Sequence, residues 1–323
     1  MRIVSRHADL PSTCRGAVVA IGNFDGVHLG HRKVIAEARA VAEEIGAPLA
    51  VMTFEPHPRA FFNPEAAPFR LTSFETKARL LAGLGVDILY ALPFDRSLAT
   101  KGAQDFVDDV LVTGIAALHV VVGEGFRFGK ARSGDVAVLG YMGEMEGFGL
   151  SVVEPLKVAT REGEEVLSSS FIRRLIAAGE VGEAARRLGY HWTIEGKVAR
   201  GAQRGRTIGF PTANLALGDY LRPAFGVYAV LAERDRGEAK ATIPGVANIG
   251  VRPTVQKESE PWLEVHLFDF EGNLYGEALA VRLVSFLRAE RKFDGIEALK
   301  RQIGEDARAA RAALAAAGDT VSP

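Results

Sequence analysis

The sequence predicts two domains: an α/β domain built on a doubly wound parallel sheet, and a small antiparallel β-barrel with a terminal helix. In the first half, continuous apolar strands alternate with amphipathic helices, which is typical of a parallel sheet covered on both faces. After about residue 187 the pattern changes to strand–turn–strand, which is typical of a small barrel. A length of 323 residues also favours two domains. We therefore expect domains over residues 1–186 and 187–323.

In the first domain, each expected strand is a short apolar run and each expected helix repeats apolar residues at helical spacing. The strands are expected over 18–24, 49–54, 88–94, 118–123 and 150–155. The helices between them are expected over 32–45, 73–84, 103–113 and 134–146. In a sheet wound in this way, ligands bind at the carboxyl ends of the strands.

In the second domain, turn signals such as residues 234–237 and 271–273 separate the expected strands. The strands are expected over 193–199, 226–233, 241–249, 262–270 and 278–286. A last helix is expected over 295–317. Its apolar stripe should cover an edge or one end of the barrel, and consists of Ile296, Leu299, Ile303 and Ala307.

Charge and cysteine content narrow the possible functions. The net charge of −1 argues against a general polyanion binder, so we expect no nucleic-acid partner. The single cysteine, Cys14, excludes an intrachain disulfide. No apolar run is long enough to span a bilayer, and the charged N-terminus does not resemble a signal peptide. We expect a cytoplasmic protein without a membrane partner, as a monomer or a weak homo-oligomer.

The most informative motif covers residues 22–31, with the sequence Gly-Asn-Phe-Asp-Gly-Val-His-Leu-Gly-His. It follows an apolar strand and leads directly into a helix. Glycines let backbone N–H groups approach an anion, and a helix N-terminus favours negative charge. Histidines near a helix start are often structural, as caps or packing residues. In this order of strand, glycines and helix, however, His28 and His31 favour a phosphate site in which imidazoles stabilise a departing pyrophosphate.

Two further segments follow strands of the first domain. Residues 53–59, Thr-Phe-Glu-Pro-His-Pro-Arg, end the second strand, and His57 and Arg59 are expected to face the same cleft. The alternative is that the prolines only shape a turn. Residues 123–130 combine aromatic, glycine and basic residues, which suits a flat ring and its phosphate. A glycine-rich surface loop is an equal alternative.

A third segment, residues 168–174, opens a helix with three serines and two arginines. Taken alone, the serines are more typical of helix N-caps. Hydroxyl groups and an arginine at a helix start also suit the phosphate tail of ATP.

The second domain carries a glycine-punctuated basic loop over residues 201–214. Thr212 and Asn214 alternate at its end, so an extended backbone places both on one side. A hydroxyl and an amide oxygen are hard ligands suited to Mg²⁺ bound to phosphates. Glu264 lies on the strand expected over 262–270 and is a candidate general base for a hydroxyl, although a carboxylate on a barrel strand is more often solvated.

Together, these motifs resemble the bifunctional bacterial riboflavin kinase/FMN adenylyltransferase family over nearly the whole chain. The resemblance implies that the first domain is a nucleotidyltransferase of the His-x-Gly-His type that transfers AMP from ATP to FMN, giving FAD and pyrophosphate. It implies an ATP site with His28 and His31 as catalytic residues, formed by Gly22, Asn23, Phe24, Asp25, His28, His31, Ser168, Ser169, Ile172 and Arg173. It implies a flavin site formed by Phe54, His57, Pro58, Phe126, Arg127 and Phe128.

The second domain resembles riboflavin kinase, a six-stranded barrel that phosphorylates riboflavin to FMN with ATP. The resemblance places Thr212 and Asn214 on a Pro-Thr-Ala-Asn motif that holds Mg²⁺ and ATP, and Glu264 on the catalytic base. It implies ATP and flavin contacts from Gly209, Phe210, Pro211, Thr212, Asn214, Asn248, Arg252, Arg288 and Phe293. The implied ligands are ATP, riboflavin, FMN, FAD, pyrophosphate and Mg²⁺.

Three alternatives remain open at this point. A nucleotidyltransferase with a single activity on another phosphorylated metabolite would have no use for the motif of residues 209–214 in a barrel. A flavin-binding regulator on a degenerate scaffold is disfavoured by the intact His28, His31 and Glu264. A nucleic-acid-binding barrel is disfavoured by the near-neutral charge.

Overall fold

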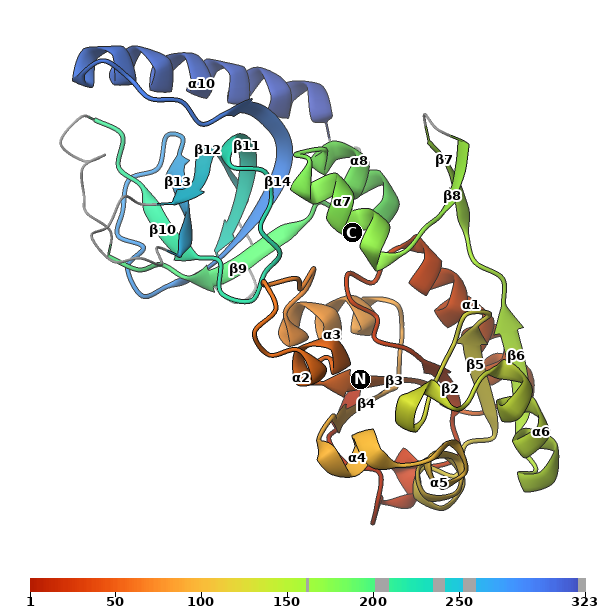
Figure 1. Ribbon diagram of the computed structural model, residues 1–323. Coiled ribbons are helices and arrows are strands. Elements are labelled where there is room, and N and C mark those ends of the chain that lie inside the picture. Colours follow the sequence, from red (N-terminus) through yellow and green to blue (C-terminus); the bar gives the residue numbers. More distant parts are fainter. Residues whose placement is uncertain (161–162, 201–208, 235–241, 252–259, 319–323) are drawn as a thin grey trace. The chain divides into compact units, whose positions relative to one another are not determined.

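The computed structural model describes residues 1–160, 163–200, 209–234, 242–251 and 260–318 (Figure 1). The chain divides into two compact units. Unit 1 comprises Met1–Ala66 and Phe74–Ser168, and unit 2 comprises Ala67–Ser73 and Ser169–Pro323.

A six-stranded sheet forms the centre of unit 1, with the order β1-β4-β3-β2-β5-β6. All neighbouring strands in it are parallel, which confirms the predicted sheet. The strands are β1 (Arg2–Val4), β2 (Val18–Ile21), β3 (Leu49–Glu55), β4 (Ile88–Pro93), β5 (His119–Gly123) and β6 (Gly149–Val153). The edge strand β1 was not predicted, because at 3 residues it is too short to show an alternating pattern.

Helices cover both faces of this sheet, as a doubly wound fold requires. The helical elements of unit 1 are η1 (Ser12–Cys14), α1 (Leu29–Ile45), α2 (Pro58–Phe62), α3 (Phe74–Gly83), α4 (Arg96–Thr100), α5 (Ala103–Phe106), η2 (Val107–Gly114), η3 (Lys130–Arg132) and α6 (Val136–Glu146). Val18 and Ala20 of β2 pack with α1 and α3. The intervening Val19 and Ile21 pack with α5, η2 and α6 on the other face. The second half of the helix predicted over 103–113 is a π-helix, η2.

Strand β2 ends three positions before its predicted end, because the backbone turns sharply after Ile21. Phe24 and Val27 have positive φ angles of 49° and 37°, in a region that side chains rarely adopt. Helix α1 then begins at Leu29, with His28 as its N-cap, so the glycine-rich motif forms the strand-to-helix turn. A small antiparallel hairpin, β7 (Lys157–Thr160) and β8 (Gly163–Val166), completes the strands of unit 1.

Unit 2 is built around a six-stranded antiparallel sheet with the order β10-β13-β12-β11-β14-β9. Its strands are β9 (Thr193–Lys197), β10 (Ala213–Ala216), β11 (Gly226–Arg234), β12 (Thr242–Val251), β13 (Pro261–Leu267) and β14 (Ala278–Ala289). A bridge between Ala199 and Asn214 joins its two ends, so the sheet is a nearly closed barrel. The predicted barrel is therefore confirmed.

Two helices and one distant segment complete the barrel unit. Helices α7 (Ser169–Ala177) and α8 (Val181–Leu188) lie in unit 2, whereas their residues up to 186 were expected in the first domain. The segment Ala67–Ser73 also belongs to unit 2. Its Leu71 carbonyl accepts a hydrogen bond of 2.8 Å from the indole nitrogen of Trp192, which is fully buried.

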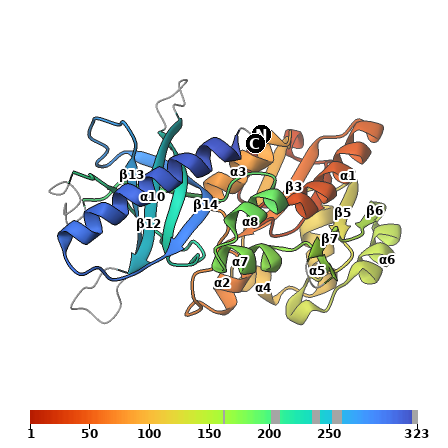
Figure 2. The same ribbon diagram turned by 90° about the horizontal axis from the view of Figure 1, so that it is seen from above.

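Helix α10 (Ile296–Ala317) runs along the barrel, against β11, β12 and β14 (Figures 1 and 2). The predicted apolar stripe is partly wrong, because Ile296 is exposed and the buried positions are Gln302, Asp306 and Ala310. The physical reason is a charge on the barrel: Arg288 pairs with Asp306, so polar residues occupy part of the buried face. No helix among the described residues combines the length and apolar character needed to cross a bilayer.

Candidate functional site

The two histidines of the glycine-rich motif stack at the N-terminus of α1. Their ring centroids are 3.6 Å apart with an interplanar angle of 20°. Nδ1 of His28 accepts a hydrogen bond of 3.3 Å from the backbone N–H of His31. That nitrogen therefore carries no proton, and in the neutral ring the proton sits on Nε2. Nε2–H and the helix N-terminus are both suited to an anionic oxygen.

The glycine between the histidines has a steric role. A Cβ atom at Gly30 would lie 3.1 Å from Nδ1 and Cε1 of His28 and 3.4 Å from the carbonyl oxygen of Leu167. A side chain there would push the His28 ring from its place over His31. The His-x-Gly-His spacing thus follows from the packing of the two rings.

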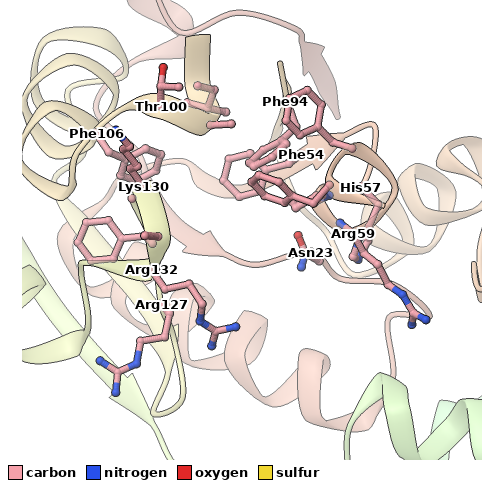
Figure 3. Close-up of a pocket in the computed structure, with 18 of the residues that line it drawn as sticks. Asn23, Phe54, His57, Arg59, Phe94, Thr100, Phe106, Arg127, Lys130 and Arg132 are labelled. Atoms are coloured by element: carbon pink, nitrogen blue, oxygen red, sulfur yellow. The ribbon is translucent and has the colours of Figure 1, made fainter. Parts of the chain in front are cut away.

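A cavity of about 970 Å³ opens at the carboxyl ends of β2, β3, β4 and β5 in unit 1 (Figure 3). It brings together eight residues that the sequence analysis assigned to ATP or flavin: Gly22, Asn23, Phe54, His57, Pro58, Phe126, Arg127 and Phe128. The buried Phe24, Asp25 and His28 do not line this cavity. The first loop residues and the predicted flavin residues therefore share one concave surface, as the carboxyl-end rule requires.

An aromatic cluster on the cavity wall was not predicted as part of the site. The ring of Phe94 lies 5.9 Å from that of Phe54, 5.4 Å from Phe61 and 5.6 Å from Phe62, all nearly edge to face. Figure 3 shows Phe94 beside Phe54 in the cavity. The signal was present, because Phe94 ends an expected strand, and rings at such an end suit a planar ligand.

Basic side chains line the opposite walls of the cavity. In Figure 3, Asn23 lies between Arg59 on one side and Arg127 and Arg132 on the other. Arg127 is engaged in an ion pair of 2.7 Å with Asp135, the N-cap of α6. Backbone hydrogen bonding from Val138, and then the bond from Arg127, hold the pKa of Asp135 below its usual value. Arg132 was not predicted and lies in a turn with a positive φ of 60°.

The remaining residues predicted for ATP lie around α7. Ser168 ends unit 1, whereas Ser169, Ile172 and Arg173 belong to unit 2. Ile172 is fully buried, so its side chain is a packing residue. Nε of Arg173 donates to the carbonyl oxygen of Phe69 at 2.8 Å, and its guanidinium carbon lies 5.4 Å from the Phe69 ring centre.

In the barrel, the strand register aligns four predicted residues in one row. Glu264 of β13 is directly opposite Asn214 of β10 on one side and Asn248 of β12 on the other. Val227 of β11 continues the row from Asn248 to Arg288 of β14. Directly opposed residues share a face of the sheet. Neighbours of Glu264 along β13 are fully buried, so the row lies on the face opposite the barrel core.

The loop before β10 is held over the barrel by β13. The backbone carbonyl of Pro211 lies 2.9 Å from Nδ1 of His266, and the Phe210 ring lies 5.4 Å from the His266 ring. Nδ2 of Asn214 donates to the carbonyl oxygen of Thr212 at 3.2 Å. This bond uses the amide nitrogen, so a cation would be ligated through the amide oxygen and the Thr212 hydroxyl. Two hard oxygen donors fit Mg²⁺.

Across the part of the chain that the structure describes, no three His, Cys, Asp or Glu side chains are grouped so as to hold a metal ion. Gly209, like Thr212, lies in the described loop before β10, but the predicted ligand Arg252 lies outside the described residues.

The end of β14 carries the last predicted residues. Arg288 makes two contacts with Asp306 of α10, Nε–Oδ1 at 2.8 Å and Nη2–Oδ2 at 2.6 Å. The Phe293 ring is flanked by two guanidinium groups, with Cζ of Arg288 at 5.7 Å and Cζ of Arg291 at 5.1 Å. Nδ2 of Asn248 donates to Glu290 at 3.0 Å. Asp306 was not predicted, because a charged side chain is more typical of a helix surface than of its buried face.

Comparison with known proteins gives two family matches in the order expected from the sequence. The FAD synthetase family model matches residues 10–170, and the riboflavin kinase family model matches residues 188–314. Three relatives are named bifunctional riboflavin kinase/FMN adenylyltransferase. The protein from Pseudomonas fluorescens is 42% identical, over 98% of both chains. The protein from Escherichia coli K12 is 40% identical over 92% of both, and that from Bacillus subtilis is 41% identical over 90% of both.

A solved structure has the same fold throughout. It is described as a macrolide-efflux protein from Streptococcus pneumoniae and is 31% identical, with a TM-score of 0.83. The likeness covers 96% of this chain and 98% of that one.

Proposed function

The chain belongs to the bifunctional riboflavin kinase/FMN adenylyltransferase family, and on that basis we propose how its residues divide the two reactions. The enzyme phosphorylates riboflavin to FMN with one ATP, and transfers AMP from another ATP to FMN, giving FAD and pyrophosphate. We assign adenylyl transfer to residues 1–186 and riboflavin phosphorylation to residues 187–323. The ranges of the two family matches support this division. A nucleotidyltransferase with a single activity does not account for the second match.

For adenylyl transfer, the stacked pair His28 and His31 carries the proposal. A phosphate oxygen of FMN attacks the α-phosphorus of ATP, the bond to the bridging oxygen breaks, and pyrophosphate leaves with the electron pair. The FMN phosphate is already an anion, so no base is required. Nε2–H of His28 and the N-terminus of α1 stabilise the charge that develops on the leaving group. We propose that Asn23 and the buried Phe24–Asp25 turn shape the binding site for the ATP phosphates beside His28.

The cavity in unit 1 is the proposed flavin site. Phe54, Phe126 and Phe128 offer aromatic faces, and the ring centroids of the last two are stacked 5.6 Å apart. Apolar rings with basic groups at the mouth suit an isoalloxazine ring with a phosphate on its ribityl chain. His57 and Pro58, which follow β3 in the sequence, line the same cavity. We propose that Ser168, at the end of unit 1, also binds ATP, and the motif alone supports the same assignment for Ser169 and Arg173 of unit 2.

For riboflavin phosphorylation, the row that places Glu264 between Asn214 and Asn248 carries the proposal. Glu264 takes the proton of the ribityl hydroxyl as its oxygen attacks the γ-phosphorus of ATP, and ADP leaves. Thr212 and Asn214 would hold Mg²⁺, which neutralises phosphate charge when bound. Arg288, at the end of the row, and Phe293, which follows β14, bind nucleotide and flavin.

Both reactions draw on ATP, and we propose that the enzyme works in the cytoplasm as a monomer or a weak homo-oligomer. We propose no nucleic-acid or membrane partner. The ligands of the family are ATP, riboflavin, FMN and FAD.

The test is conversion of riboflavin by the purified full chain with ATP and magnesium, followed by chromatography of the flavins. FMN should appear first and FAD second, and FMN supplied alone should give FAD. Removal of magnesium with EDTA should stop riboflavin phosphorylation. Failure to convert riboflavin at all, or conversion of an unrelated alcohol instead, would overturn the proposal.

A further inference from the structure

A buried polar chain ties the glycine-rich loop to its neighbouring strand. Thr53 of β3 is fully buried, and its hydroxyl donates a hydrogen bond of 3.0 Å to the backbone carbonyl of Asn23. Lys77 of α3 is 2% exposed. Its Nζ lies 3.4 Å from the Thr53 hydroxyl and 2.9 Å from Oε1 of Glu55. No step of the two reactions described above uses Thr53 or Lys77.

The Thr53 hydroxyl both donates and accepts a hydrogen bond. An ammonium group only donates, so Lys77 donates to the Thr53 oxygen while the Thr53 proton goes to Asn23. Hydrogen bonds in series polarise one another in a low-dielectric interior. A buried polar side chain without a hydrogen-bond partner is unfavourable. The burial of Thr53 and Lys77 therefore indicates that their hydrogen bonds have a specific role.

The loop that this chain holds is under backbone strain. Phe24 directly follows Asn23 and has a φ of 49°. Such angles cost about 1–3 kcal/mol and persist only where surrounding contacts fix them. One backbone bond, from Gly22 N to Met52 O at 3.1 Å, also fixes the loop, and any residue would supply it. Of these two hydrogen bonds, the one from Thr53 depends on a side chain, and the one from Gly22 does not.

The hydrogen-bonded series begins at Asn23 and ends at Glu55, next to different parts of the site. Asn23 and Gly22 line the cavity, and Figure 3 places the Asn23 side chain at its centre. Glu55 lies two positions before His57, which with Pro58 forms another wall. Lys77 therefore connects the ATP-side loop with the flavin-side segment.

We propose that Thr53 and Lys77 are positioning residues for adenylyl transfer, which fix the loop of Asn23 against the flavin-side wall. The inference rests on the proposed function, because it needs the cavity to be the site of that reaction. Neither side chain touches the reacting atoms. Their loss should therefore disturb the alignment of the two substrates rather than remove a chemical group.

The test compares Thr53→Val, which keeps the side-chain shape but loses the hydroxyl, with Thr53→Ser, which keeps the hydroxyl. FAD formation from FMN is measured as kcat and KM for each substrate, and riboflavin phosphorylation in the same samples serves as the control for folding. Thr53→Val should lower kcat/KM for ATP about tenfold or more, since a small misplacement costs up to about a hundredfold. Thr53→Ser should stay within about threefold of the unaltered enzyme, and phosphorylation should not change.

Lys77→Met gives a second test if Thr53→Val does not fold, and should produce the same selective loss. The inference is overturned if Thr53→Val forms FAD normally, or if Thr53→Ser loses as much activity as Thr53→Val. His28→Ala distinguishes a failure of the positioning role from a failure of the proposed active site. If His28→Ala abolishes FAD formation while Thr53→Val has no effect, the positioning role alone is wrong. If neither variant changes FAD formation, the assignment of the site is wrong as well.

Discussion

Arg288 at the end of β14 and Asp306 in the middle of α10 form a two-contact ion pair, and Gln302 donates a further 2.8 Å hydrogen bond to the same carboxylate. The Asp306 side chain is 8% exposed and that of Arg288 is 21% exposed. The terminal helix thus fixes a residue proposed to bind substrate in the kinase site.

We predict that Asp306→Asn lowers riboflavin phosphorylation. The substitution keeps the shape of the side chain but leaves the Arg288 guanidinium without its counter-charge, which costs about 1–3 kcal/mol. We expect kcat/KM to fall about tenfold with FAD formation from FMN unchanged. Asp269→Asn is the matched control, because the Asp269–Arg311 pair is exposed and contributes little. Equal effects of the two substitutions would contradict the role of α10.

Glu264→Gln should abolish FMN formation. The amide keeps the volume of the side chain and cannot take a proton from the ribityl hydroxyl, so a loss of about a hundredfold or more is expected. FAD formation from supplied FMN should continue at its normal rate. The two products are separated by chromatography in one assay. Unchanged turnover of riboflavin in this variant would refute the role of Glu264 as base.

His28→Ala and His31→Ala should slow FAD synthesis by about two orders of magnitude or more, since each removes a donor to the leaving pyrophosphate or its stacked support. Riboflavin phosphorylation is the internal control and should not change. Single-turnover measurement with FMN and ATP isolates the chemical step. A rate within a few-fold of the unaltered enzyme would remove the histidines from the mechanism.

Phe94→Ala should weaken FMN binding. Phe94 is central to the aromatic cluster, and aromatic pairs contribute about 0.5–1.5 kcal/mol beyond the area they bury. We expect KM for FMN to rise about tenfold with kcat little changed. Tyr141→Ala on α6 removes an exposed ring that does not line the cavity, and gives the control. A change in kcat without a change in KM would assign Phe94 to another task.

The ion pair between Arg127 and Asp135 predicts a pH dependence of stability. The pKa of Asp135 is lowered by backbone hydrogen bonds and by Arg127, so folding favours the charged form. The resulting stabilisation is present above the ordinary value of 3.8 and is lost as the pH falls through the lower folded value. Asp135→Ala should therefore be less stable than the unaltered chain at neutral pH, and the difference should disappear in acid. Denaturant unfolding at several pH values measures the difference, and a pH-independent difference would contradict the lowered pKa of Asp135.

Local patterns were sufficient for most of the architecture. The apolar runs predicted the parallel sheet of unit 1, since each buried strand is nearly continuous in apolar residues. The His-x-Gly-His motif placed His28 at a helix start, where it is the N-cap of α1. Strand register could not be predicted, so the row that joins Asn214 to Arg288 through Glu264 appears only in the folded barrel.

Residues missed by the sequence analysis owe their roles to distant contacts. Asp306 is buried because Arg288, 18 positions away, needs a counter-charge, whereas helical periodicity favours apolar residues on that face. Thr53 lies inside a recognised motif, but its bond to Asn23 joins residues 30 positions apart. Neither pairing has a local signature.

The path of Ala67–Ser73 affects how the two activities can be dissected. A polypeptide shortened to residues 1–186 would retain this segment but lose Trp192 and Tyr220, which bond or bridge to Leu71 and Arg70. The Leu71 carbonyl would then lose the Trp192 indole donor, which is buried in the intact protein. Low yield or aggregation of such a fragment would reflect this stranded stretch and would say nothing about the adenylylation chemistry. Point substitutions in the full-length enzyme are the sounder way to silence one activity at a time.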